Sequence, residues 1–267
     1  MNILTEIANY TKERIARQKQ LLSLGEVRSR AEAMAKAKAG QSFRQALAAP
    51  GLSVIAELKA ASPSKGIIAQ DFASRYLQQA KAYAAGGAAA ISCLTEPKYF
   101  LGSDEYLRQV RQTVELPLLR KDFTIDEYMV YEAKSIGADA VLLICSLLSG
   151  AQLAEYLALA KELGMDALVE AHDAKELERA VLAKAEIIGV NNRDLQDFSI
   201  NMGNSLKLRQ LTPQGISFVA ESGIKSLEDI RLLQEAGVDG VLIGELLMSS
   251  KNPGRLLQEI RGVKNEG

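Results

Sequence analysis

The sequence predicts an α/β fold, a (β/α)8 TIM barrel with an N-terminal helical extension. From residue 53 onward, eight short apolar runs alternate with longer amphipathic stretches. This alternation is typical of a parallel sheet covered by helices. Eight units between residues 53 and 267 match the usual size of a closed barrel. A doubly wound open sheet is the alternative, but no G-x-G-x-x-G motif follows the first run, and the units are roughly even in length.

The apolar runs give the predicted strands, and the stretches between them give the helices. The strands are expected at residues 53–57, 89–93, 117–121, 140–144, 166–170, 186–190, 216–220 and 240–244. Helical spacing of apolar residues is clearest at 76–85, 152–161 and 227–235. Ser149, Asp173 and Ser226 stand just before helical stretches, where their side chains can cap a helix. Gly137 and Gly237 stand where a helix is expected to end.

Residues 1–50 differ from the repeating part of the chain. They are rich in Ala, Lys, Arg, Gln and Glu, with apolar residues at helical spacing at Ile3, Ile7 and Tyr10. We predict two or three helices here, with Ser42 and Phe43 opening the last one. These helices either cover the open bottom of the barrel or cross its top near the active site, and the pattern does not decide between the two. We expect residues 1–267 to form one barrel domain, with residues 1–50 as its extension.

The bulk composition is that of an ordinary soluble globular protein. The chain has 267 residues, of which 48% are hydrophobic, and a formal net charge of −1. Nucleic-acid and membrane-surface partners usually require a strong basic excess, so we expect neither. No apolar run reaches the ~20 residues of a membrane-spanning helix, and the first residues lack a secretory apolar region. We therefore expect a cytoplasmic protein, with a monomer as the default oligomeric state.

The two cysteines and the single histidine limit the possible chemistry. Cys93 and Cys145 each lie at the end of an apolar run, and neither belongs to a Cys-x-x-Cys or Cys/His cluster. We interpret them as buried, reduced thiols. A lone histidine, His172, excludes an ordinary histidine-rich zinc site, and we predict no metal. It also excludes a catalytic triad, unless His172 itself serves.

Charged and amide side chains stand at the carboxyl ends of the predicted strands. Glu57 and Lys59 are two residues apart and therefore share one face of an extended strand, where alone they could form a structural ion pair. Later units hold further polar residues at similar positions: Lys121, Glu170, Asn191, Arg193 and Glu221. Barrel enzymes place their chemistry at this end of the strands. The recurrence favours one shared active-site cleft over separate structural charges.

Three loops of small residues indicate a phosphate site. Ser222 and Gly223 follow the seventh strand, and Gly244 and Glu245 come at the end of the eighth. These two loops form the usual phosphate site of such barrels, because small residues let an anion approach backbone N–H groups. A third loop, SPSKG from Ser62, belongs to the first unit, which adjoins the eighth in a closed barrel. We therefore expect a small phosphorylated substrate.

An ordered set of motifs resembles indole-3-glycerol phosphate synthase. The motifs are ELK at 57–59, SPSKG at 62–66, LTEPKYF at 94–100, RKDF at 120–123, GVNNRDL at 189–195 and AESGI at 220–224. The match covers roughly residues 50–250. The resemblance implies a carboxy-lyase of tryptophan biosynthesis that needs no cofactor. It would convert 1-(2-carboxyphenylamino)-1-deoxyribulose 5-phosphate into indole-3-glycerol phosphate, carbon dioxide and water.

The resemblance also implies roles for two lysines and a glutamate. Lys121 would be the general acid that assists attack at the ribulose carbonyl. Glu170 would be the general base of the dehydration. Lys59 would contact the anthranilate carboxylate, and whether it also transfers a proton is left open.

The remaining site residues are assigned by the same resemblance to orientation and binding. Glu57, Asn191 and Glu221 would orient the reacting groups and the substrate hydroxyls. The phosphate would be held by Ser62, Ser222, Gly223, Gly244 and Glu245. The anthranilate ring would lie among Phe100, Phe123, Leu142 and Leu195. Arg193 matches a further position of the binding motif.

Three positions, in two loops, depart from the family pattern. Ala60 and Ala61 occupy places where relatives often carry a basic residue, so contacts from this loop to the substrate would be weaker. Glu245 stands where a small hydroxyl residue would suit a phosphate better. We expect its side chain to turn away while its backbone N–H faces the anion. For His172, just past Glu170, a contact at the start of a helix is favoured over a catalytic role.

Three other functions remain open from the sequence alone. Another phosphate-binding barrel, phosphoribosylanthranilate isomerase, would not need two lysines at this spacing. A Schiff-base aldolase would use Lys121 as its nucleophile. A non-catalytic barrel could bind a sugar phosphate through the same loops.

Overall fold

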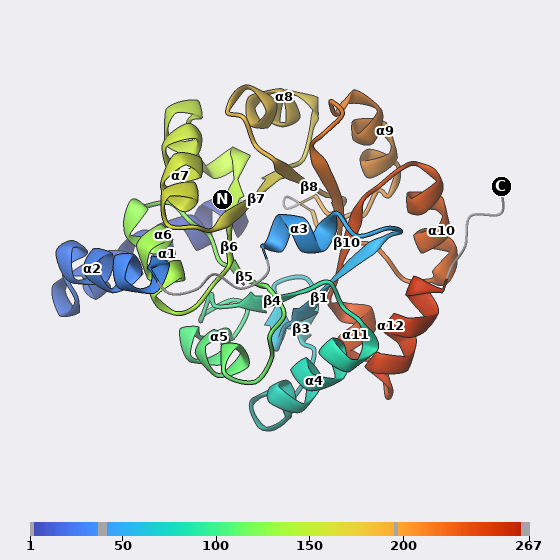
Figure 1. Cartoon of the computed structure of the whole chain (residues 1–267), viewed down its shortest axis with the longest axis horizontal. Helices are drawn as coiled ribbons and strands as arrows, with labels where there is room; N and C mark the ends of the chain where they lie inside the picture. The colour runs from blue at the N-terminus through green and yellow to red at the C-terminus, as the bar shows by residue number, and fades with distance from the viewer. Residues whose placement is uncertain (1–2, 37–41, 195–196, 263–267) are drawn as a thin grey trace.

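The computed structural model, which describes residues 3–36, 42–194 and 197–262, is a closed parallel barrel surrounded by helices (Figure 1). Its strands, in order around the barrel, are β1 (Ser53–Leu58), β4 (Ala90–Leu94), β5 (Leu118–Lys121), β6 (Ala140–Ile144), β7 (Asp166–Ala171), β8 (Ile187–Asn191), β9 (Ser217–Glu221) and β10 (Gly240–Ile243). All eight predicted strands are confirmed to within one residue at each end. β1 pairs with β10, which closes the barrel and rules out the open sheet.

The helices lie in a ring outside the strands. The ring contains α4 (Phe72–Gly86), α5 (Asp104–Arg111), α6 (Glu127–Ser135), α7 (Gly150–Glu162), α8 (Ala174–Leu182), α9 (Gly203–Leu211), α10 (Leu227–Glu235) and α12 (Pro253–Arg261). Shorter elements are η1 (Cys145–Leu147), α11 (Glu245–Met248) and the hairpin of β2 (Ala61–Ser62) with β3 (Gly66–Ile67). Within the residues that the structure describes, no helix is both long enough and apolar enough to cross a membrane.

Predicted capping residues fix the ends of several helices. The side chains of Ser149, Asp173 and Ser226 accept hydrogen bonds from backbone N–H groups in the first turns of α7, α8 and α10. Gly137 and Gly237 adopt φ values of 94° and 74° just after α6 and α10, where residues with a Cβ would be strained. These three caps and two glycines are therefore confirmed.

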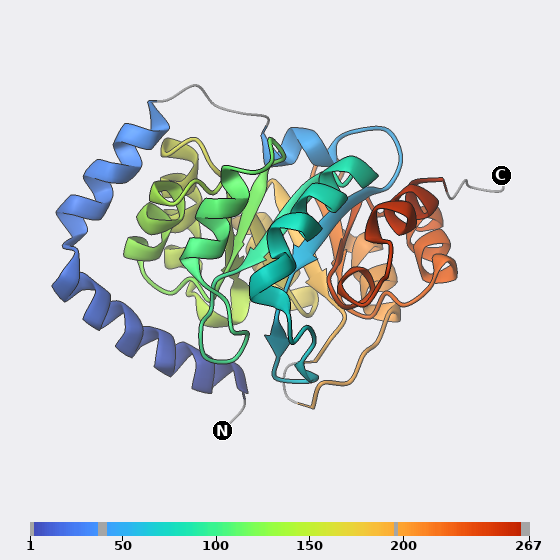
Figure 2. The ribbon, with the colours of Figure 1, turned by 90° about the horizontal axis from the view of Figure 1, so that it is seen from below.

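The N-terminal extension reaches both ends of the barrel (Figure 2). At the amino end of the strands, α3 (Phe43–Leu47) buries Phe43 against the inner barrel core. Ser42 caps α3, and its hydroxyl also donates to Asp166 at the start of β7 at 2.8 Å. At the other end, α1 (Ile3–Leu21) adds Ile7 to the same core. Both predicted positions for the extension are thus occupied, by different helices, while α2 (Leu24–Ala35) packs on α6.

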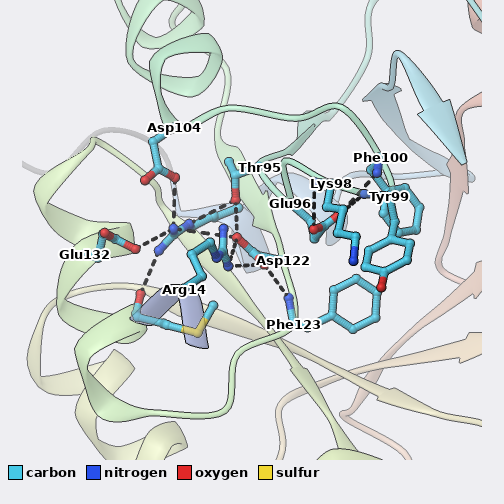
Figure 3. A network of polar contacts seen from close by, with 12 residues as sticks. Arg14, Thr95, Glu96, Lys98, Tyr99, Phe100, Asp104, Asp122, Phe123 and Glu132 are labelled. Atoms are coloured by element: carbon cyan, nitrogen blue, oxygen red, sulfur yellow. Dashed lines mark hydrogen bonds and ion pairs between the residues drawn. The ribbon is translucent and has the colours of Figure 1, made fainter. Parts of the chain in front are cut away.

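Polar contacts fasten α1 to the loops that follow β4 and β5 (Figure 3). The Arg14 guanidinium donates to both carboxylate oxygens of Asp122, at 2.8 and 2.9 Å. Lys19 pairs with Asp126 at 2.8 Å, and the hydroxyl of Tyr99 donates to the Glu6 carboxylate at 2.8 Å. Charge-assisted hydrogen bonds are among the stronger ones in proteins. The helix is therefore held at several points along its length.

A buried network also anchors the end of β5 from outside the barrel. Arg120 is 1% exposed and donates to Asp104 at 2.9 Å, Glu132 at 2.6 Å and the Met129 carbonyl at 3.0 Å. Thr95 joins the network by accepting from Arg120 and donating to Asp122. Successive side chains of a strand point to opposite faces. With Arg120 anchored on the outside, the next residue of the strand, Lys121, points into the barrel, where it lines the central cavity.

Replacing Arg120 by methionine should destabilise the protein strongly. The change leaves the carboxylates of Glu132 and Asp104 without their buried cation, which typically costs about 3–5 kcal/mol. Arg255→Met is a matched control, because the Arg255 side chain is 75% exposed and pairs with Glu259 one turn away on the helix surface; it should change stability by less than ~0.5 kcal/mol. Urea unfolding measures both free energies, and equal losses in the two variants would contradict the role given to the network.

Candidate active site

The predicted site residues meet around one cavity at the carboxyl ends of the strands. The cavity has a volume of about 310 Å³. Every predicted site residue in the described part of the chain lines this cavity, and together these residues come from every strand end that the sequence indicated. The predicted residue Leu195 lies outside the described residues. Parallel strands end at one face of a closed barrel, which brings side chains far apart in sequence to one place.

Lys121 lies at the centre of the charged residues in this cavity. Its ammonium forms an ion pair with Glu221 from β9 and lies 3.3 Å from Oε2 of Glu170 from β7. Asn191 at the end of β8 donates to the other Glu170 oxygen at 3.3 Å. The two carboxylate side chains are 4% and 2% exposed, so neither charge is solvated by bulk water. One cation is therefore shared by two buried carboxylates.

The surrounding charges decide the protonation of these groups. Burial would lower the pKa of Lys121, but Glu221, Glu170 and Glu57 reverse this and raise it, so the ammonium stays protonated at neutral pH. Burial would likewise raise the pKa of Glu170, yet Lys121 and His172 hold it below the usual value. For Glu221, burial prevails over Lys121, and its pKa rises to about 7. The site thus contains a charged acid beside an ionised carboxylate that can serve as a base.

Glu57 and Lys59, at the end of β1, form an ion pair in the lining of the same cavity. The Lys59 side chain is 17% exposed and the Glu57 side chain 5% exposed. A carboxylate at this depth requires a cation or hydrogen-bond donors. Glu57 therefore holds the Lys59 ammonium at the rim of the cavity, within reach of an incoming anion.

Two glycines make room for the carboxylates, and sequence reasoning missed their role. A Cβ at Gly189 in β8 would overlap the Glu221 carboxylate. A Cβ at Gly244 would overlap Glu57 and come within 3.0 Å of the Lys59 ammonium. Gly244 was predicted to be a phosphate-binding residue, and Gly189 appeared only as part of a motif. A glycine inside a strand often marks the close approach of another group, and that signal could have identified Gly189.

One end of the cavity is built from loops of small residues. Ser222 and Gly223 have φ values of 64° and 85°, in the left-handed region, directly after β9. A Cβ on Gly223 would clash with Ile200 and Met202. The Glu245 side chain is about half exposed and pairs with Lys65 at 3.1 Å. The Glu245 carboxylate faces this lysine, and the assignment of its backbone to a phosphate stays a prediction.

The other end of the cavity is apolar. Phe100 and Phe123 lie with ring centroids 5.8 Å apart, and Leu142 lines the same region. Leu4 and Ile7 from α1 complete the lining, which the sequence did not indicate. Helical spacing showed only that α1 has an apolar face, without showing what that face contacts.

A buried glutamate shapes the loop that carries Phe100 (Figure 3). Glu96 is fully buried, and its carboxylate accepts backbone N–H bonds from Lys98, Tyr99 and Phe100 at 2.9, 2.7 and 3.0 Å. Three donors on one carboxylate fix the turn that precedes the ring. Glu96 belongs to the motif LTEPKYF, but the sequence does not indicate this role.

The cysteines and the histidine lie outside the cavity lining. Cys93 and Cys145 are buried and unpaired, and burial raises the pKa of each thiol to about 12, so neither is a thiolate at neutral pH. The backbone N–H of His172 donates to Glu176 in the first turn of α8, which is the helix-start contact we favoured. Among the described residues, no cluster of His, Cys, Asp and Glu side chains is arranged to hold a metal ion.

Comparisons with known proteins agree with this geometry. The family model for indole-3-glycerol phosphate synthase matches residues 4–260. A protein of that name from Ruminiclostridium cellulolyticum is 49% identical over 260 residues, covering 97% of this chain and 99% of the relative. Another from Lachnoclostridium phytofermentans is 46% identical over 271 residues, covering 98% and 99%.

Solved structures show the same fold at much lower identity. A thiamine phosphate pyrophosphorylase from Pyrococcus furiosus has a TM-score of 0.60 at 18% identity, covering 82% of this chain and 96% of the other. KGPDC from Streptococcus mutans has a TM-score of 0.59 at 14% identity, covering 79% and 95%. At such identities the likeness concerns the barrel alone. The family match over nearly the whole length and the nearly half-identical relatives, by contrast, show that this chain belongs to the indole-3-glycerol phosphate synthase family.

Proposed function

We propose that this chain closes the indole ring of indole-3-glycerol phosphate with Lys121 as the general acid and Glu170 as the general base. As a member of its family, the chain is a carboxy-lyase of tryptophan biosynthesis. The observation that carries the assignment is the Lys121 ammonium, which lies between two buried carboxylates in a cavity with one apolar end and one end of small residues. A charged acid and an ionised base at one place suit a reaction that first delivers and later removes a proton.

The two ends of the cavity suit the two ends of the substrate, 1-(2-carboxyphenylamino)-1-deoxyribulose 5-phosphate. We assign the anthranilate ring to the apolar end, against Phe100, Phe123 and Leu142, where aromatic surface is removed from water. We assign the phosphate to the opposite end, at Ser62, Ser222, Gly223 and the backbone at Gly244 and Glu245. Backbone N–H groups there can approach an anion closely.

In the ring-closing step, the aromatic carbon that bears the carboxylate attacks the ribulose carbonyl. A proton passes from the Lys121 ammonium to the carbonyl oxygen, which becomes a hydroxyl. The carbon–carbon bond to the carboxylate then breaks, carbon dioxide leaves, and the electron pair enters the iminium-like ring system. Because the adduct accepts these electrons itself, the step requires no cofactor.

In the dehydration step, Glu170 removes a proton from the ring system and passes it to the new hydroxyl, whose carbon–oxygen bond breaks as it leaves as water. The loss of carbon dioxide from a carboxylate consumes one proton overall, and uptake of that proton from solvent restores the Lys121 ammonium. Glu170 can do this because nearby cations keep its carboxylate ionised. Asn191 donates to one Glu170 oxygen, and Glu221 holds Lys121, so both residues orient the reacting pair. Arg193 lines the cavity beside them and is assigned to substrate binding.

Lys59 is assigned to the substrate carboxylate. Its ion pair with Glu57 is at the cavity wall, where a second anion could join the ammonium without displacing the first. We also propose a cytoplasmic location and a small phosphorylated molecule as the partner, supported by the reduced thiols and the biosynthetic family. Contacts of α1 and α3 with both ends of the barrel support one domain over the described chain.

Removing either member of the acid–base pair should lower turnover far more than affinity. We expect Lys121→Met and Glu170→Gln each to lower kcat by about 10²–10⁴-fold, because each change removes a proton-transfer group. The fluorescence of the indole product measures the rate. Lys161→Met is the control, since its side chain is 83% exposed and absent from the cavity lining, and it should retain the wild-type rate.

Melting temperatures of the same variants distinguish loss of catalysis from loss of fold. A variant that raises KM but keeps kcat would show that its residue only binds the substrate. Near wild-type turnover in folded Lys121→Met would refute the general-acid assignment.

Gly189→Ala should damage the site through a side chain that never touches the substrate. The added methyl group would displace the Glu221 carboxylate from Lys121, so we expect kcat to fall by at least ~10-fold. Gly150→Ala is the matched control, because a Cβ at Gly150 meets nothing within 4 Å at the start of α7. Steady-state kinetics and urea unfolding of both variants test the idea. Full activity in Gly189→Ala would mean that the Glu221–Lys121 ion pair is dispensable.

A further inference from the structure

The single histidine of the chain lies between two carboxylates at the end of β7. Its Nδ1 is 3.2 Å from Oε2 of Glu176 in the first turn of α8, and its Nε2 is 3.4 Å from Oε1 of Glu170. The backbone N–H of His172 donates to Glu176 at 2.8 Å, and its backbone carbonyl accepts from Asn204 of α9 at 2.9 Å. The ring is therefore held from two neighbouring helices and directed at a residue in the active-site cavity.

The two oxygens of Glu170 face different partners. Oε2 faces the Lys121 ammonium at 3.3 Å. Oε1 faces the Asn191 amide at 3.3 Å and the His172 ring. Among the described residues, the buried His172 Nε2 forms no hydrogen bond, and it lies 3.4 Å from the Glu170 carboxylate. When the ring is protonated this nitrogen carries a proton, and Glu170 is the acceptor that faces it.

We infer that His172 is a positioning residue that acts through Glu170: as an imidazolium it orients this carboxylate and keeps it ionised when Lys121 turns to the substrate. The inference rests on the proposed role of Glu170 as the base. During ring closure, the Lys121 ammonium donates to the substrate carbonyl and therefore pairs less closely with Glu170. His172 supplies a second cation that does not take part in the reaction.

The charges around the ring favour its protonated form. Glu170 faces it from β7, Glu176 from α8 and Glu221 from β9, while Lys121 lies beyond Glu170 on the far side. Burial would lower the pKa of His172, but Glu176 and Glu170 raise it to about 9. In return, His172 is one of the cations that lower the pKa of Glu170. The two groups stabilise each other's charged forms.

Loss of the His172 charge should therefore weaken the ionised form of the base. With one cation fewer, the pKa of Glu170 rises, so the acidic limb of the kcat–pH profile moves to higher pH. We expect a shift of roughly one pH unit in His172→Gln, with KM changed less than about twofold. His172→Lys keeps a positive charge beside Glu170 and should return the limb most of the way to its wild-type position.

Asp173→Ala separates this effect from damage to the helix. Asp173 caps α8 by accepting from the backbone N–H of Glu176, but it belongs to none of the groups assigned to catalysis. We expect this variant to melt at a lower temperature and to keep the wild-type acidic limb. If Asp173→Ala and His172→Gln move the limb equally, or if His172→Gln leaves it in place, the inference is wrong.

An NMR titration tests the charge on the ring without any use of activity. The chain has one histidine, so its imidazole resonance is unambiguous. We expect a pKa well above the ordinary 6.5, lowered by about one unit or more in Glu170→Gln and in Glu176→Gln. A pKa near 6.5 in the wild type, or one unchanged by Glu170→Gln, would overturn the inference.

The two tests fail independently of the proposed function. If folded Glu170→Gln keeps turnover, the assignment of Glu170 as the base is wrong, whatever the histidine titration shows. If Glu170→Gln loses turnover but the histidine titration does not respond to it, the base assignment stands and the role of His172 is refuted.

Discussion

The site depends on the two ion pairs that the Lys121 ammonium forms with Glu170 and Glu221. Burying two carboxyl groups beside one ammonium is unfavourable unless they pair with it in good geometry. The chain meets this condition with a glycine at position 189, which leaves space for the Glu221 carboxylate. Hydrogen bonds also hold the Arg120 side chain on the outer side of the barrel, so that the next residue of β5, Lys121, points inward. Catalytic geometry and barrel packing are therefore aspects of one arrangement.

Much of this could be predicted because the barrel imposes its own geometry. Short apolar runs identify the strands, and a closed parallel sheet brings their carboxyl ends together, which places Lys121, Glu170 and Glu221 at one face of the barrel. What the sequence did not reveal depends on contacts without local periodicity. Arg14 and Asp122 are 108 residues apart, and nothing near either residue indicates the other. Gly189 resembles any strand glycine until the partner that occupies its space is known.

The N-terminal extension illustrates the same limit. Its apolar spacing was clear, but an amphipathic helix can cover either end of a barrel, and here separate helices cover both. The consequence for function is that Leu4 and Ile7, which precede the barrel in sequence, form part of the apolar cavity wall. Arg14 joins their helix to Asp122, the residue that follows Lys121. One helix, α1, therefore contributes both to the apolar cavity wall and to the contacts that hold the end of β5.

The account is tested most directly by incubating the protein with 1-(2-carboxyphenylamino)-1-deoxyribulose 5-phosphate and following indole fluorescence and carbon dioxide release together. A proton-delivering Lys121 and a proton-removing Glu170 in one cavity predict both products in equal amounts, with no added metal or cofactor. Borohydride added during turnover should trap no covalent adduct, because in the proposed mechanism Lys121 donates a proton and does not attack the carbonyl. Two results would contradict the proposed reaction. One is binding of the substrate without formation of indole, and the other is a borohydride-trapped covalent bond between Lys121 and the substrate.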